Sequence, residues 1–342
     1  MALEISFTSL GLAVLDELQF PNRQPLTDIL GGSGAYATLG ARLFLPRPSS
    51  SRVGWMLHIG NDFPESIQTD LERWNTTLIV DREPDKPSTR GLLVYKDTTF
   101  GPKEFKYTTP TLSIEDAHLA NTALLHSKAF HLLETPQNIL PRVSSLLALR
   151  RRAGVPHRPL LIWEPSPPAC KPEALQLCRD AAPVVDVLSP NHLELLALCG
   201  ESPPATDADI DRAQIERLAW MFLQDGVGPD RTGTVVVRAG EAGCLVSSRR
   251  MSPTWLPPFY GPNSANVVDA TGAGNAFLGA YAVGYLRTGR AIDAACYGSV
   301  GASFAVEQVG LPERNDDDDE GERWNGVSVQ SRFREYTAKT RQ

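Results

Sequence analysis

Short apolar runs rich in β-branched residues alternate with stretches of helical periodicity along almost the whole chain. This alternation is typical of βαβ units, in which helices cover both faces of a mostly parallel sheet. We therefore predict an α/β fold of three layers. The expected strands span residues 5–14, 53–59, 77–80, 91–96, 129–133, 160–163, 184–188, 234–238, 244–247 and 267–268. The expected helices span residues 33–45, 63–73, 138–152, 172–181, 192–199 and 211–224.

Two segments interrupt the alternation. Residues 91–97 and 104–108 have the pattern of a β-hairpin, and a further exposed β segment is expected within 15–29. We expect them to form a small sheet, a lid built from about residues 15–30 and 90–110, on a single domain that spans residues 1–342.

An acidic run lies near the end of the chain, at Asp316-Asp317-Asp318-Asp319-Glu320. The run lacks the glycine turn and alternating spacing of a calcium-binding loop. We expect a solvated loop or insertion over about residues 313–323.

Charge and cysteine content exclude several classes of protein. The net charge of −7 over 342 residues, without a Lys/Arg block, argues against a nucleic-acid partner. Five scattered cysteines without a CxxC pair indicate reduced thiols, and six histidines without an HExxH motif predict no metal cage. No apolar run reaches membrane-spanning length, and the first twenty residues lack the basic start of a signal peptide. We expect a cytoplasmic protein without a membrane partner.

The segment from Val268 to Tyr281 carries the strongest functional signal. A β-like step, 266–268, leads into the glycine turn Gly272-Ala273-Gly274 and then into a helix of small residues. A glycine turn at a helix start directs free N–H groups and the positive end of the helix dipole at one point. This segment therefore predicts an anion site, suited to a phosphate or a transferring phosphoryl group.

The residues of this segment resemble the C-terminal signature of the PfkB (ribokinase-like) sugar and nucleoside kinases, D-T-x-G-A-G-D. The chain reads Asp269-Ala270-Thr271-Gly272-Ala273-Gly274-Asn275. The resemblance implies that Gly272, Ala273 and Gly274 form the anion hole. It also implies that Asp269 and Thr271 belong to a loop that binds a monovalent cation such as K⁺. Asn275 stands where the family has its catalytic base, an aspartate.

The N-terminal part resembles the substrate-binding half of the same family. Gly31 and Gly32 match the glycines that let the backbone approach a sugar, and Tyr36 stands where the family usually has an asparagine. Asp16 follows a segment that resembles the first strand of the family, whose final aspartate grips substrate hydroxyls. Taken alone, Asp16 is equally well explained as a turn residue.

Two further motifs resemble the nucleotide-binding half. Asn191 and Glu194 match the P-N-x-x-E motif, which implies that Glu194 holds Mg²⁺ through water near the triphosphate. The alternative is an asparagine N-cap with a glutamate in the first turn of a helix. Arg238, Gly240 and Gly243 resemble the adenine-nucleotide loop, for which a plain hairpin turn is the alternative.

The resemblance implies a ribokinase-like fold and an ATP- and Mg²⁺-dependent phosphotransferase. The acceptor would be an alcohol group of a sugar or nucleoside-like molecule. The alternative is a catalytically weak or inactive relative that binds nucleotide or ligand as a regulatory protein, because an asparagine at position 275 cannot accept a proton. A homodimer through the lid is compatible with the family. Neither strand order nor the phosphoryl acceptor is readable from the sequence.

Overall fold

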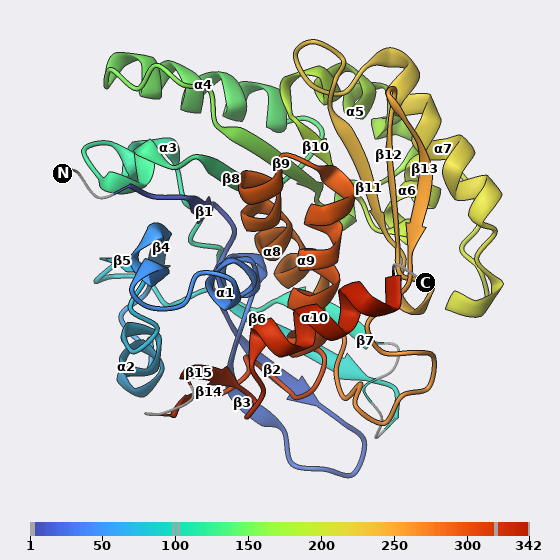
Figure 1. The fold of residues 1–342 in the computed structure, drawn as a ribbon. Coiled ribbons are helices and arrows are strands. Elements are labelled where there is room, and N and C mark those ends of the chain that lie inside the picture. Colours follow the sequence, from blue (N-terminus) through green and yellow to red (C-terminus); the bar gives the residue numbers. More distant parts are fainter. Residues whose placement is uncertain (1–3, 98–99, 101–102, 318–320, 341–342) are drawn as a thin grey trace.

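A nine-stranded sheet forms the centre of the computed structural model, which describes residues 4–97, 100, 103–317 and 321–340 (Figure 1). Its order is β13-β12-β11-β10-β9-β8-β1-β4-β5, and all neighbours pair in parallel except β11–β12 and β12–β13. The strands are β1 (Phe7–Ser9), β4 (Val53–Ile59), β5 (Thr77–Arg82), β8 (Ala129–Glu134), β9 (Leu160–Pro165), β10 (Val187–Leu188), β11 (Thr234–Arg238), β12 (Cys244–Ser248) and β13 (Met251–Leu256). The predicted mostly parallel sheet is confirmed.

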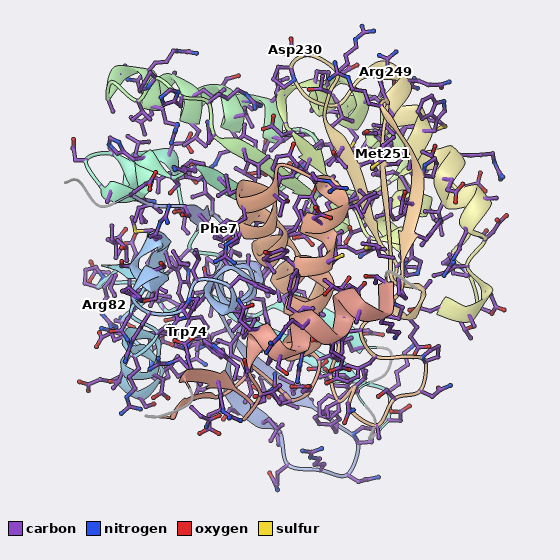
Figure 2. All side chains as sticks on the ribbon, in the orientation of Figure 1. Phe7, Trp74, Arg82, Asp230, Arg249 and Met251 are labelled. Carbon is purple, nitrogen blue, oxygen red and sulfur yellow. The ribbon has the colours of Figure 1, made fainter. Side chains whose placement is uncertain are left out.

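Helices cover both faces of this sheet. Successive residues of each strand point to opposite faces, so a strand can contribute apolar side chains to the core on both sides. In β4, Trp55 and Leu57 join one core cluster and Met56 joins the other. The first cluster includes α1 (Ser33–Leu43), α2 (Glu65–Glu72), α8 (Ala273–Thr288), α9 (Ala291–Ala305) and α10 (Val329–Thr340). The second includes α3 (Asp116–Leu119), α4 (Ile139–Arg152), α5 (Leu175–Ala181), α6 (His192–Leu198) and α7 (Arg212–Asp225). Phe7 lies deep inside, whereas Asp230 and Arg249 lie at the periphery (Figure 2).

Close contact between α1 and α8 brings the two glycine-rich motifs together. A Cβ atom on Gly279 would lie 1.8 Å from the carbonyl oxygen of Ala37, and one on Gly40 would lie 1.9 Å from that of Ala276. Only glycine allows two backbones to approach this closely. The starts of both helices therefore face the same region of the molecule.

A second sheet of four strands has the order β3-β2-β6-β7. It contains β2 (Val14–Gln19), β3 (Leu26–Gly31), β6 (Arg90–Tyr95) and β7 (Lys103–Tyr107), and it occupies the lower part of the view in Figure 1. The segment expected to run as one strand from residue 5 to 14 is divided, because β1 ends at Ser9 and β2 begins the second sheet at Val14. Of the residues expected to join the hairpin, 98–99 and 101–102 lie outside the described residues.

Two other expectations are wrong in detail. Residues 267–268 form no strand: the amides of Val268 and Asp269 both donate to the carbonyl of Val306, which ties the segment to the end of α9 instead of a sheet. The segment expected to be a loop at 313–323 contains the antiparallel pair β14 (Arg314–Asp317) and β15 (Gly321–Trp324). Residues 318–320 of the acidic run lie outside the described residues.

The pair β14–β15 is held to the body of the protein by its second strand. Trp324 is fully buried, and the carboxylate of Glu322 accepts two hydrogen bonds from the buried guanidinium of Arg42 on α1, at 2.7 and 2.5 Å. These contacts explain why this segment is not a free loop. Among the described residues, no helix is both long enough and apolar enough to cross a membrane.

Candidate active site

A cavity of about 160 Å³ lies where the second sheet meets the starts of α1 and α8. Its lining includes Asp16, Gly32, Tyr36, Gly272 and Asn275, which lie in three separate segments of the sequence. A larger cavity of about 560 Å³ shares Leu12, Ser33, Tyr107 and Leu133 with it and extends towards Glu134 and Arg142. The structure therefore brings the predicted substrate and phosphoryl residues to one site.

The predicted anion loop begins α8. Gly272 is its N-cap with a φ of 77°, and a Cβ there would lie 2.1 Å from the ring of Tyr36, so both the backbone conformation and the contact require glycine. No described residue accepts a backbone hydrogen bond from the amides of Gly274 and Asn275. Because α8 has 16 residues, these free amides lie at the positive end of a full helix dipole. The loop is partly exposed and can receive an anion.

Asn275 is held by a buried carboxylate. Its Nδ2 donates to Oε2 of Glu164 at 2.5 Å, and the same oxygen lies 3.0 Å from Nε2 of His131. Arg238 reaches the other oxygen of Glu164 at 2.9 Å. Although burial opposes ionisation, Arg238 and His131 hold the pKa of Glu164 below its usual value. Residue 275 thus serves as a hydrogen-bond donor to a charged partner.

Arg238 lies against the anion loop. A Cβ on Gly274 would lie 2.0 Å from Nη1 of Arg238, and Nη2 donates to the carbonyl of Ser189 at 2.9 Å. The side chain is only 11% exposed. The sequence predicted a nucleotide contact at Arg238; the structure places its guanidinium beside the start of α8.

Asn191 and Glu194 form a complete capping box at the start of α6. The Asn191 side chain accepts from the Glu194 amide at 2.8 Å, and Glu194 accepts from the Asn191 amide at 2.7 Å. Nη2 of Arg238 lies 3.5 Å from Glu194. Burial raises the pKa of Glu194 to about 7, against the attraction of Arg238 and together with the repulsion of Glu164. The capping alternative describes the observed contacts, and Mg²⁺ binding through water stays a prediction.

Gly240 and Gly243 lie in the turn between the antiparallel strands β11 and β12, so the segment is a hairpin turn. Asp207 covers this turn: its Oδ2 accepts from the Glu241 amide at 3.0 Å, and its Oδ1 lies 3.5 Å from Nε2 of His192. The turn follows the end of β11, next to Arg238. Its contact with a nucleotide also stays a prediction.

Asp16 is the buried acid of the smaller cavity. It pairs with Ile29 and Gly91 in the second sheet, and no described residue makes a hydrogen bond to its Oδ1. Burial raises the pKa of Asp16 to about 7; the charge of Lys103 acts against this shift and that of Asp269 adds to it. Gly31 lies beside it, since a Cβ there would come within 2.3 Å of Oδ2. A carboxylate oxygen without a partner can accept a hydrogen bond from a substrate hydroxyl.

Tyr36 occupies the other wall of the cavity. Its side chain is buried against Gly272, and its pKa is raised by burial and by the charges of Asp269 and Asp16. Tyr36 therefore keeps its phenol proton and forms a rigid part of the cavity wall.

Lys103 is a contact that the sequence did not reveal. From β7, its Nζ donates to Thr271 Oγ1, to Tyr95 at 3.1 Å and to Asp269 Oδ1 at 3.3 Å. The two residues predicted to bind a monovalent cation are thus bound by an ammonium group from the second sheet. Nothing in the hairpin pattern around residue 103 signals this contact.

The sequence also missed His131 and Glu164. Both lie on strands whose positions were predicted nearly correctly, β8 and β9. The available signal was that Glu164 follows directly after the expected strand 160–163, at the end where parallel sheets bind ligands. His131 had no such signal, because it lies within a buried strand.

The model of the family described as pfkB family carbohydrate kinase matches residues 21–317. This chain belongs to the pfkB family. An uncharacterized protein of Schizosaccharomyces pombe is similar to this pfkB-family chain, with 32% identity over 97% of this chain and 93% of that protein. Inositol 3-kinase of Arabidopsis thaliana is 40% identical over 79 residues, 23% of this chain and 21% of that enzyme.

Two solved structures share the fold of this chain. Ribokinase from Giardia lamblia superposes with a TM-score of 0.72 and 15% identity, covering 98% of this chain and 99% of that one. An Escherichia coli protein with the provisional name Ribokinase II, in complex with ATP and Mg²⁺, gives a TM-score of 0.68 and 18% identity, covering 98% and 100%. This pfkB-family protein therefore has the ribokinase fold, with its mostly parallel sheet and small β lid.

Proposed function

We propose that this pfkB-family protein is a phosphotransferase that uses ATP and Mg²⁺ and phosphorylates an alcohol group of a sugar, polyol or nucleoside-like molecule. One observation carries the proposal: Gly272 and Asn275, at the start of α8 where two backbone amides are free, line the same cavity as the unpartnered Asp16. The similarity to a kinase of a polyol and to an ATP–Mg²⁺ complex supports the choice of substrates. We further propose that the protein acts in the cytoplasm.

In this proposal the acceptor hydroxyl donates a hydrogen bond to Asp16, and the γ-phosphoryl group lies at the amides of Gly274 and Asn275. The bond from γ-phosphorus to the bridging oxygen of ADP breaks as the bond to the acceptor oxygen forms. Glu194 would hold Mg²⁺ through water, and the ion would supply charge neutralisation for the triphosphate. Such reactions depend mainly on positioning and on charge stabilisation.

Proton removal is where this protein departs from its family. Asn275 cannot accept a proton, and Glu164 is occupied by His131, Arg238 and Asn275. We propose that Asp16 accepts the hydroxyl proton, because a pKa of about 7 suits a base that works near neutral pH. If Asp16 is this base, its removal is expected to slow turnover by about 10²- to 10⁴-fold, the usual contribution of general-base catalysis.

The second candidate function is a ligand-binding protein without turnover. It is favoured by one observation, the engagement of Asn275 by the charged Glu164, which commits the catalytic position to a structural hydrogen bond.

The deciding experiment measures ATP-dependent product formation over a panel of sugars, cyclitols and nucleosides. Wild type is compared with Gly274→Ala, whose Cβ would meet Arg238, and with Gly261→Ala, where nothing lies within 4 Å. We expect turnover by wild type and Gly261→Ala and its loss in Gly274→Ala. If wild type binds nucleotide, as shown by thermal stabilisation, but forms no product, the second candidate function replaces the first.

A further inference from the structure

Three side chains of the kinds that bind metal ions lie close together outside the two cavities. The sequence analysis predicted no metal cage from the spacing of the histidines. His58 of β4, Asp81 of β5 and His118 of α3 each present a ligand atom, and these atoms all lie within 4.8 Å of one another. His58 and Asp81 are direct partners in the parallel pairing of β4 and β5, so they share one face of the sheet. Glu83, just beyond β5, lies beside them.

The ring of His58 is prepared to act as a ligand. Its Nδ1 lies 3.1 Å from the carbonyl oxygen of Ser113, which can only accept, so Nδ1 carries the proton. In the neutral ring, Nε2 therefore holds a lone pair. This nitrogen is buried, and no described residue makes a hydrogen bond to it. Metal-binding histidines are commonly oriented by such a bond from the second ring nitrogen to a carbonyl.

This lone pair faces negative charge. Nε2 of His58 lies 3.4 Å from Oε1 of Glu83 and 3.8 Å from Oδ2 of Asp81. Two carboxylates and a lone pair around one point repel one another, and a cation bound among them relieves this repulsion more directly than Lys86, which lies 3.2 Å from the outer carboxylate of Glu83. Nε2 of His118 lies 4.0 Å from the same oxygen of Asp81 and completes the group.

The spacing fits a small transition-metal ion. Ligand atoms about 2.0–2.2 Å from a tetrahedral Zn²⁺ lie roughly 3.3–3.6 Å from one another. The distances of 3.8 and 4.0 Å to Asp81 lie close to that range, and the three ligand atoms, which lie within 4.8 Å of one another, must draw together to reach it. We propose that His58, Asp81 and His118 bind a divalent transition-metal ion of the Zn²⁺ type, with Glu83, whose Oε1 lies 3.4 Å from Nε2 of His58, beside the open fourth position.

Two existing contacts must yield to the ion. Nδ1 of His118 accepts a hydrogen bond from the Glu115 amide, so coordination by Nε2 requires the ring proton to move to Nδ1 and that bond to be lost. Nζ of Lys86 lies 3.2 Å from Oε1 of Glu83 and must turn away. Both contacts are solvent-accessible, so losing them costs the protein little.

A bound ion would restrain the segment that contains Ser113 and His118. Ser113 contacts His58, His118 lies on α3, and Ser113 and Asp116 both line the larger cavity. Metal binding would therefore tie the ends of β4 and β5 to one wall of that cavity.

The test counts metal on the whole protein. After treatment with a chelator, wild type is dialysed to equilibrium against Zn²⁺, beside the double variant Asp81→Asn/His118→Gln and the matched surface variant Asp70→Asn/His126→Gln. We expect one Zn²⁺ fewer on the double variant, or binding weaker by at least about tenfold, with no change in the surface variant. Equal unfolding midpoints in chelator show that all three proteins are folded.

Co²⁺ serves as the second probe, because its visible spectrum distinguishes nitrogen and oxygen ligands from thiolates. We expect no thiolate band, which separates this site from the five cysteines. Equal Zn²⁺ affinity and stoichiometry in wild type and the double variant would overturn the proposal. In that case a proton on His58 balances the two carboxylates.

Discussion

At the scale of single residues, the site is defined by what its charged groups already bind. Glu164 shares the guanidinium of Arg238 with Glu194, and it is the closer of the two, at 2.9 against 3.5 Å. Glu164 therefore keeps its charge, and Asn275 donates to it. An asparagine at position 275 is the natural partner of a glutamate at position 164.

Restoring the family's aspartate is therefore expected to harm this protein by itself. In Asn275→Asp, a carboxylate replaces the amide that donates to Glu164, and we expect a loss of about 1–3 kcal/mol in the free energy of unfolding. Adding Glu164→Gln supplies a donor again and should recover most of the loss. Urea unfolding measures both, with Asn266→Asp at the surface as the control. Equal stability of Asn275→Asp and wild type would show that the Glu164 contact has no energetic role.

Lys103 leads to a prediction about monovalent cations. Because its ammonium group already binds Asp269 and Thr271, added K⁺ should affect wild type little. In Lys103→Met, K⁺ should raise turnover and the unfolding temperature relative to choline. Lys106→Met, on the same strand, is the control. Activation of wild type by K⁺ as large as that of Lys103→Met would contradict this account.

At the scale of elements, β7 of the second sheet presents aromatic side chains to the site. Phe105 is 50% exposed and Tyr107 45% exposed, yet both line cavities. Aromatic surface that faces a polar cavity is available to pack against the carbon skeleton of a polyol. A homodimer through the lid, which the sequence analysis gave only as compatible with the family, would cover the same surface.

Phe105→Ala is expected to weaken substrate binding more than it slows turnover. Loss of the apolar contact between the Phe105 ring and a bound substrate should cost about 1–2 kcal/mol, which raises KM roughly tenfold. Val94→Ala on the neighbouring strand, 38% exposed, is the control. Steady-state kinetics with the substrate found in the panel give both constants, and an unchanged KM would remove Phe105 from the site.

The elements were largely predictable, because apolar periodicity reflects burial on the faces of a sheet. The points at which strands end were less predictable. Nothing in residues 10–13 marks the change from one sheet to the other, and Val267 and Val268 look like strand residues although the end of α9 binds their segment. The glycine motifs were predictable because a cluster of glycines indicates a place where the backbone approaches another backbone or a ligand closely. The partners Lys103, His131 and Glu164 were not, because they meet through the tertiary fold.

At the scale of the whole molecule, two buried acids set how stability depends on pH. Asp16 and Glu194 have folded-state pKa values of about 7, above the ordinary values of the unfolded chain. The folded protein therefore binds more protons between about pH 4 and pH 7. The stabilisation is complete below the unfolded pKa and is lost as the pH rises through about 7.

Stability is thus expected to fall from about pH 4 to pH 7, by at most about 1.4 kcal/mol per pH unit for each acid. Asp16→Asn should flatten this dependence, and Asp70→Asn at the surface should leave it unchanged. Chemical unfolding at several pH values measures the slope. A free energy of unfolding that rises over this range would show that neither acid is protonated in the folded state.

The glycine contacts between α1 and α8 have a mechanical consequence. Backbones that touch at Gly40 and Gly279 cannot slide or separate without opening a gap in the core. The loop before α1 and the loop before α8 must then travel as one rigid unit. If the proposed transfer takes place, we expect the site to open through the four-stranded sheet, which requires Lys103 to release Asp269 and Thr271.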